Sequence, residues 1–125
     1  MKRKVRFFER HLDFGDNTLI LIVYNKESEA LDILKNTYDV EIEHPGDCEG
    51  FAYVEDEYCF LCLKNGFQYS ILVHELTHLV FKMLDRYSIT LNEQTEETFA
   101  MQMESLFRIV IILLIEDRYK LPIPK

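Results

Sequence analysis

The sequence lacks the surplus of basic residues that a broad nucleic-acid-binding surface requires. It contains 14 Lys and Arg against 22 Asp and Glu, which gives a formal net charge of −8 at pH 7. Binding to a phosphate backbone depends on clustered cations that displace counterions. The one basic cluster, at residues 2–6, is short, and we interpret it as a solvated chain end rather than a contact arm. We therefore expect no nucleic-acid partner.

Cysteine is scarce and long apolar segments are missing. The three cysteines, Cys48, Cys59 and Cys62, are an odd number, which does not favour a disulfide framework. No apolar segment of secretory length follows the first four residues. The longest apolar run, residues 109–115, is far shorter than the ~20 residues that span a bilayer. We expect a soluble, cytoplasmic protein with reduced cysteines and no membrane partner.

Internal repeats, low-complexity tracts and linkers are also missing, so residues 1–125 are predicted to form one domain. Hydrophobic periodicity predicts strands and helices in this order: a strand at 18–24, a helix to about 37, strands at 51–54 and 58–63, and helices at about 68–86 and 93–117. This order predicts an α+β fold in which a small sheet packs against helices. Residues 109–115 are apolar almost all round, which leaves a homodimer open.

A short motif, His74-Glu75-Leu76-Thr77-His78, stands inside a strongly helical pattern. Helical residues four apart project from the same face, so both imidazoles can reach one Zn²⁺ at about 2.0–2.1 Å. Glu75 is offset around the helix, where its carboxylate can act as general base on a water activated by the metal. The alternative interpretation is two structural histidines and a surface glutamate. We favour the metal site because the segment is helical, apolar and directly preceded by a predicted strand hairpin.

A catalytic zinc site requires a third protein ligand and one open coordination position. The next predicted helix offers two neighbouring candidates, Glu96 and Glu97. Glu96 shares a helical stripe with apolar residues and is expected to point toward the core. Glu97 is three residues before Ala100, whose small side chain permits close approach to the motif helix. This spacing favours Glu97 and leaves Glu96 open. Acidic residues here also stabilise a helix N-terminus, whichever one binds metal.

The motif, together with Glu97-Thr98-Phe99-Ala100, resembles the zincin-type metallopeptidases whose third zinc ligand is a glutamate. The short chain is similar to the minimal metallopeptidases that tailed phages and prophages often encode. The resemblance covers about residues 50–115. It implies a minimal zincin-like fold, zinc bound by His74, His78 and Glu97, and Glu75 as the base. In such enzymes a strand before the motif helix holds an extended peptide by backbone pairing, a role open to residues 51–54 or 58–63.

The sequence therefore predicts a zinc-dependent hydrolase, in its simplest form a peptidase with a protein or peptide substrate. Glu75 would accept a proton from water and pass it to the leaving amine. The alternative is a non-catalytic protein-binding module with a structural or vestigial metal site. A structural zinc usually has four protein ligands, whereas the chain offers three, which favours the hydrolase. Cys59 and Cys62, three apart on a predicted strand, would face opposite sides and are not expected to share an ion.

Overall fold

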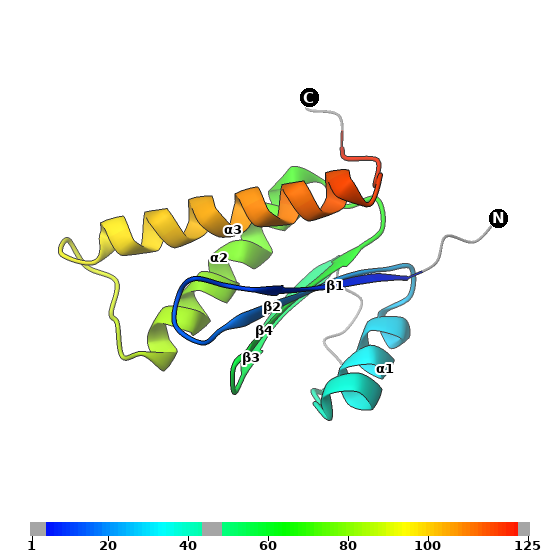
Figure 1. The fold of residues 1–125 in the computed structure, drawn as a ribbon, viewed down its shortest axis with the longest axis horizontal. Coiled ribbons are helices and arrows are strands. Elements are labelled where there is room, and N and C mark those ends of the chain that lie inside the picture. Colours follow the sequence, from blue (N-terminus) through cyan, green and yellow to red (C-terminus); the bar gives the residue numbers. More distant parts are fainter. Residues whose placement is uncertain (1–4, 44–48, 123–125) are drawn as a thin grey trace.

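The computed structural model describes residues 5–43 and 49–122 of the chain. Cys48 and the basic residues 2–4 lie outside the described residues. The fold is α+β, with a four-stranded mixed sheet packed against three helices (Figure 1). The elements follow in the order β1 (Arg6–His11), β2 (Thr18–Tyr24), α1 (Glu27–Tyr38), β3 (Gly50–Glu55), β4 (Tyr58–Lys64), α2 (Tyr69–Arg86) and α3 (Glu96–Glu116).

The strands lie in the sheet in the order β1-β2-β4-β3. β2 and β4 are parallel, whereas β1 pairs antiparallel with β2 and β3 pairs antiparallel with β4. The predicted hairpin of two strands is present, and its turn places Asp56 in the left-handed region with φ of 52°. Since β4 lies inside the sheet, β3 is the strand of this hairpin whose outer edge is open among the residues that the structure describes. Of the two strands considered for peptide pairing, only β3 has that edge.

Both faces of β2 are covered, which explains its near-continuous apolar sequence. Successive strand residues point to opposite faces, so one set packs with α1 (Ile20, Ile22, Tyr24) and the other packs with α2 and α3 (Leu19, Leu21, Val23). α1 therefore covers one face of the sheet, and α2 and α3 cover the other (Figure 1). The same alternation places Cys59 and Cys62 in different cores. The expectation that they face opposite sides is confirmed.

Strand β1 is not predicted by the sequence pattern, which contains no apolar alternation there. It is an edge strand with largely exposed side chains, and it is ordered by pairing with β2. Arg6 at its start donates to the backbone oxygen of Asp117 at 3.0 Å and also pairs with the Asp117 carboxylate. The interpretation of residues 2–6 as a solvated chain end is therefore wrong for Arg6, which contacts the end of α3.

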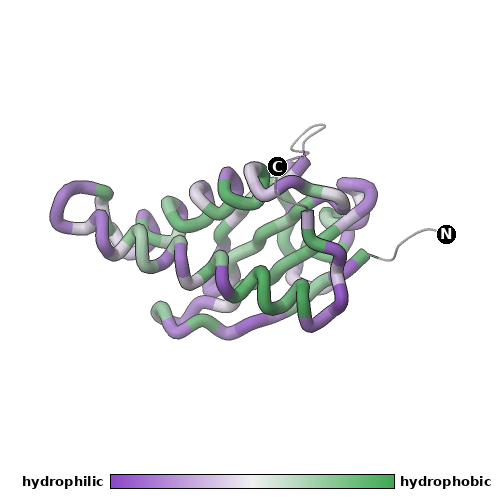
Figure 2. Tube along the Cα trace, turned by 90° about the horizontal axis from the view of Figure 1, so that it is seen from above, coloured by the Kyte–Doolittle hydropathy of each residue, from purple (hydrophilic) through white to green (hydrophobic). Residues whose placement is uncertain are grey.

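The last helix begins at Glu96, later than the predicted residue 93, because a turn precedes it. The side-chain oxygen of Asn92 accepts hydrogen bonds from the amides of Gln94 and Thr95, at 2.8 and 3.2 Å. Such local side-chain bonds favour a turn over a helix. The loop before α3 is mostly hydrophilic and forms one tip of the molecule (Figure 2).

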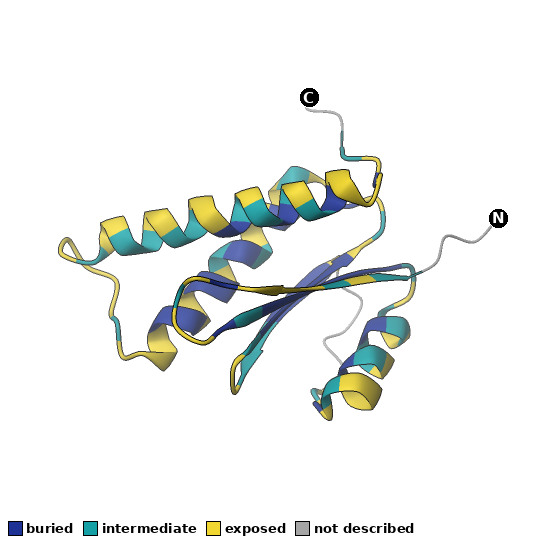
Figure 3. Cartoon of the chain, viewed as in Figure 1, coloured by how far each residue is buried: buried dark blue, intermediate teal, exposed yellow. Residues whose placement is uncertain are grey.

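By length and composition, α3 is the one helix within residues 5–43 and 49–122 that could span a bilayer. Apolar helices of water-soluble proteins meet the same criterion. In this fold α3 contributes three buried residues to the core between α2 and the sheet: Leu106, Val110 and Leu114. The opposite side of α3 is largely exposed (Figure 3).

Candidate metal centre

Helix α2 turns its apolar side to the sheet and its motif histidines to the surface. Six of its residues are buried at helical spacing: Leu72, Leu76, Leu79, Val80, Met83 and Leu84. His74 and His78 fall outside this stripe and are exposed. Packing of the apolar stripe therefore fixes the direction in which the two imidazoles project.

The two histidine side chains lie side by side. Their Nε2 atoms are 3.2 Å apart, and their ring centroids are 4.7 Å apart with an interplanar angle of 79°. Two imidazole nitrogens bound to one tetrahedral Zn²⁺ at about 2.0–2.1 Å lie about 3.3 Å from each other. The observed spacing also permits a hydrogen bond when one of the two nitrogens carries a proton. The pair is thus arranged to share either one proton or one metal ion.

Glu75 lies next to this pair but is much less exposed. Its side chain is 12% exposed, against 64% for His74. The distance from Glu75 Oε2 to His74 Nε2 is 4.0 Å, which is too long for a hydrogen bond. The carboxylate therefore stands beside the imidazole pair without occupying the nitrogen that a metal would use.

Gly50, the first residue of β3, allows Glu75 to take this position. A Cβ atom on Gly50 would lie 3.1 Å from Glu75 Cγ and 3.0 Å from the backbone oxygen of Cys62. A side chain at residue 50 would therefore crowd both groups, and the glycine leaves the glutamate room at the start of the strand. Gly50 was not among the predicted site residues. The sequence does contain one indication of this role, a glycine at the start of the strand hairpin before the motif helix. Glycine in a strand often marks a place where another group approaches the backbone closely.

The open edge of β3 lies beside α2. The Lys64 amide donates to the Glu49 oxygen at 2.9 Å, and alternation along the antiparallel ladder then turns the backbone groups of Ala52 outward. Lys82 of α2 donates its ammonium to this outward Ala52 oxygen at 2.7 Å. Lys82 was also not predicted, because the contact depends on how α2 crosses the strand. The lysine occupies one of the acceptors that an added strand would use.

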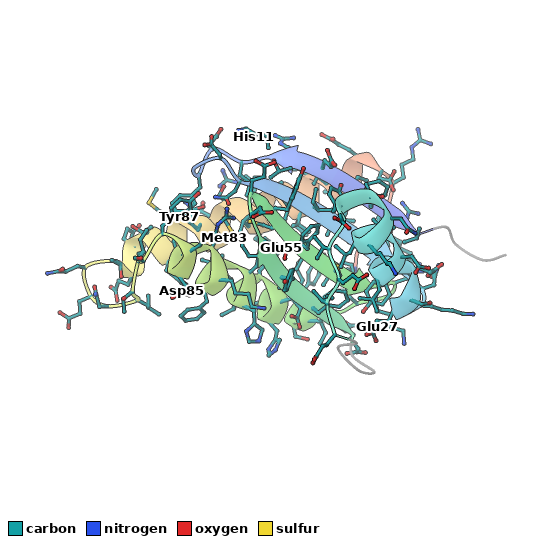
Figure 4. The ribbon with its side chains drawn as sticks, turned by 90° about the horizontal axis from the view of Figure 1, so that it is seen from below. His11, Glu27, Glu55, Met83, Asp85 and Tyr87 are labelled. Atoms are coloured by element: carbon teal, nitrogen blue, oxygen red, sulfur yellow. The ribbon has the colours of Figure 1, made fainter. Side chains whose placement is uncertain are left out.

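A cavity of about 360 Å³ lies where β3 and the end of α2 come together. Figure 4 labels two residues of these elements, Glu55 on β3 and Asp85 on α2. The cavity is lined by Tyr53, Val54, Lys82, Asp85 and Arg86. Its position beside the open edge suits a side chain of a segment that runs along β3.

Comparison with known proteins gives no relative. No family model, no curated protein and no solved structure matches this chain. The resemblance to zincin metallopeptidases therefore depends on the motif helix and the residues around it.

The structure does not bring the predicted third ligand to the histidines. Glu96 and Glu97 are both exposed in the first turn of α3. Among the residues that the structure describes, no three or more His, Cys, Asp or Glu side chains form a group that could hold a metal ion. An aromatic contact joins α3 to the turn after His78, where the rings of Phe81 and Phe99 are 5.0 Å apart. The assignment of Glu97 as a ligand stays a prediction.

Cys59 does not extend this site. Its thiol is buried in the core between the sheet and α2, and burial raises its pKa to about 12 despite the nearby Arg86 guanidinium. A metal binds the thiolate form of cysteine. A thiol that stays protonated in the core is a poor ligand at neutral pH.

Proposed function

We propose that this protein is a zinc-dependent hydrolase, a peptidase with a minimal zincin-like fold, in which His74 and His78 bind the metal. The observation that supports this proposal best is the 3.2 Å between their Nε2 atoms, which fits two ligands of one tetrahedral ion. Neutral imidazole is a preferred zinc ligand. Zinc bound there would supply a Lewis acid that polarises a carbonyl and lowers the pKa of water.

Glu75 is the proposed general base. Its side chain is largely shielded from solvent and lies between the imidazole pair and the start of β3. From there it can accept a proton from a water beside the histidines and pass it to the leaving amine. Glu97 is our proposed third ligand, with Glu96 as the alternative. Both lie in the first turn of α3, so that turn has to move toward the histidines to complete the ligand set.

The proposed substrate is an extended segment of a protein or peptide. An added strand on the β3 edge would bond to the outward backbone groups of Ala52 and Val54. The edge runs along α2 and starts at Gly50, next to Glu75. A peptide held there would pass close to the base, and it would replace the Lys82 ammonium at the Ala52 oxygen.

Metal content tests the site directly. We expect about one zinc per chain by elemental analysis of protein purified without chelator, and loss of that zinc in His74→Ala and His78→Ala. His11→Ala is the matched control, because His11 is an exposed histidine on β1. Wild-type protein that stays free of zinc after incubation with the metal would overturn the proposal.

Turnover separates the hydrolase from the alternative function. With fluorescently labelled casein as the probe, Glu75→Gln should retain zinc and lose about 10²–10⁴-fold in cleavage rate, the usual contribution of a positioned base. Wild-type protein that retains zinc and binds peptide but cleaves nothing would instead support a non-catalytic binding module. That alternative is favoured by one observation, the incomplete metal-ligand set among the described residues.

A further inference from the structure

Helix α3 has an apolar side that none of the described elements covers. Only 17% of the residues in the most apolar 18-residue stretch of this helix are buried. Met101, Ile112 and Ile115 are 59%, 42% and 57% exposed, and each lies roughly opposite the buried residues Leu106 and Val110 around the helix. A surface groove of about 510 Å³ follows the same helix, lined by Met103, Glu104, Phe107, Arg108, Ile111 and Ile112. We refer to these exposed and groove-lining residues together as the outer face of α3.

The charges on the outer face are arranged so that the face is complementary to itself. Glu104 and Arg108 form an ion pair at 2.8 Å, and both side chains are about two-thirds exposed, at 71% and 67%. They are the only charged residues of α3 between Glu97 and Glu116. Their midpoint is the middle of the helix. If a second α3 lay antiparallel with a two-fold axis at that point, Glu104 of each copy would meet Arg108 of the other.

Two of the three exposed apolar residues, Met101 and Ile112, fit the same axis. Met101 lies about one and a half turns before the midpoint, and Ile112 lies about one and a half turns after it. In the antiparallel pair these side chains would therefore come together on both sides of the central charges. The same face then serves both copies, as a two-fold interface requires.

We propose that two copies of this chain associate through the outer face of α3, with the two helices antiparallel about a two-fold axis between Glu104 and Arg108. A bilayer is the other apolar environment that a helix of this composition could enter. It is disfavoured because both charges would lie at its centre, where ionised side chains are costly. Across the two-fold axis each charge has an opposite partner.

Sedimentation equilibrium of the full chain over a range of micromolar concentrations tests the proposal. We expect a mass approaching twice the 15.0 kDa of one chain. Arg108→Glu and Glu104→Arg each place like charges across the axis and should weaken association by about tenfold or more. The double exchange Glu104→Arg with Arg108→Glu restores opposite charges and should restore the dimer. Lys120→Glu, at an exposed residue beyond α3, changes the net charge as Arg108→Glu does and should leave the dimer intact.

Circular dichroism of each variant establishes that the fold is retained. A wild-type chain that is monomeric at all concentrations overturns the proposal, as does a dimer that both single reversals leave unchanged. Monomeric protein that floats with phosphatidylcholine vesicles would assign the outer face to a lipid surface instead.

Discussion

The Cγ atom of Glu75 lies 3.1 Å from the position that a Cβ atom would take on Gly50. We expect Gly50→Ala to lower the free energy of unfolding by about 1–3 kcal/mol, the usual cost of adding a group to a packed site. The added methyl group would also meet the Cys62 oxygen, which is backbone and cannot turn away. Urea unfolding monitored by circular dichroism measures the change.

The double variant Gly50→Ala with Glu75→Ala identifies which contact matters. If Glu75 takes part in the steric clash, Gly50→Ala should lower the free energy of unfolding by less in the Glu75→Ala variant than in the wild type. An equal cost in both backgrounds would attribute the loss to the Cys62 oxygen alone and contradict a positioning role for Gly50.

Zinc should raise the melting temperature of the protein, because an ion that binds only the folded state stabilises it. At a free zinc concentration about 100 times the dissociation constant, the stabilisation is about 2.7 kcal/mol. Differential scanning fluorimetry with and without a chelator measures it. His78→Ala should abolish the rise, whereas His11→Ala should keep it. An equal rise in all three proteins would show that zinc binds elsewhere.

Lys82→Met should make the β3 edge more prone to pair with another strand, since it frees the Ala52 oxygen. Charged side chains at an edge protect it against such pairing. We expect faster aggregation on warming, measured by light scattering, and little change for Lys120→Met, an exposed lysine that follows α3. Lys82→Arg retains a donor and should behave like the wild type. Identical aggregation of Lys82→Met and the wild type would mean that the edge needs no protection by this lysine.

The buried thiol of Cys59 should lower the free energy of unfolding at alkaline pH. Burial raises its pKa from 9.0 to about 12, so above pH 9 the unfolded chain releases a proton that the folded chain keeps. The unfolding free energy should therefore fall with rising pH, by up to about 1.4 kcal/mol per pH unit from this group. Cys59→Val, which cannot titrate, should show a shallower fall between pH 9 and 11 in urea unfolding. Parallel pH profiles for the two proteins would contradict the assignment.

Elements with a strong local pattern could be predicted from the sequence. β2 is recognisable because burial on both faces makes its sequence apolar throughout, and α2 because its buried residues recur at helical spacing. The meeting of His74 and His78 is also local, since the two residues are one helical turn apart. These features depend on residues close in sequence and need no knowledge of the fold.

The features that could not be predicted from the sequence depend on contacts between segments that are distant along the chain. β1 carries no apolar alternation and is held by β2 and by the end of α3. The contact of Gly50 with Glu75 and the bond from Lys82 to Ala52 follow from the path of α2 across the β3 edge. The position of Glu97 depends on the turn at residues 92–95. Because of the hydrogen bonds in this turn, α3 begins later than helical periodicity alone predicts.

The bond between Arg6 and Asp117 joins residues 111 positions apart, and it has a consequence for how the chain folds. Contacts of such large sequence separation form slowly, because a long loop has to close before they stabilise anything. On the ribosome, β1 is made before the other three strands of this sheet, but this contact can form only after residue 117 has emerged. Until then β1 is held by β2 and by the hydroxyl of Tyr38, which donates to Glu9. A nascent chain stalled before α3 would expose the core residues that α3 later covers.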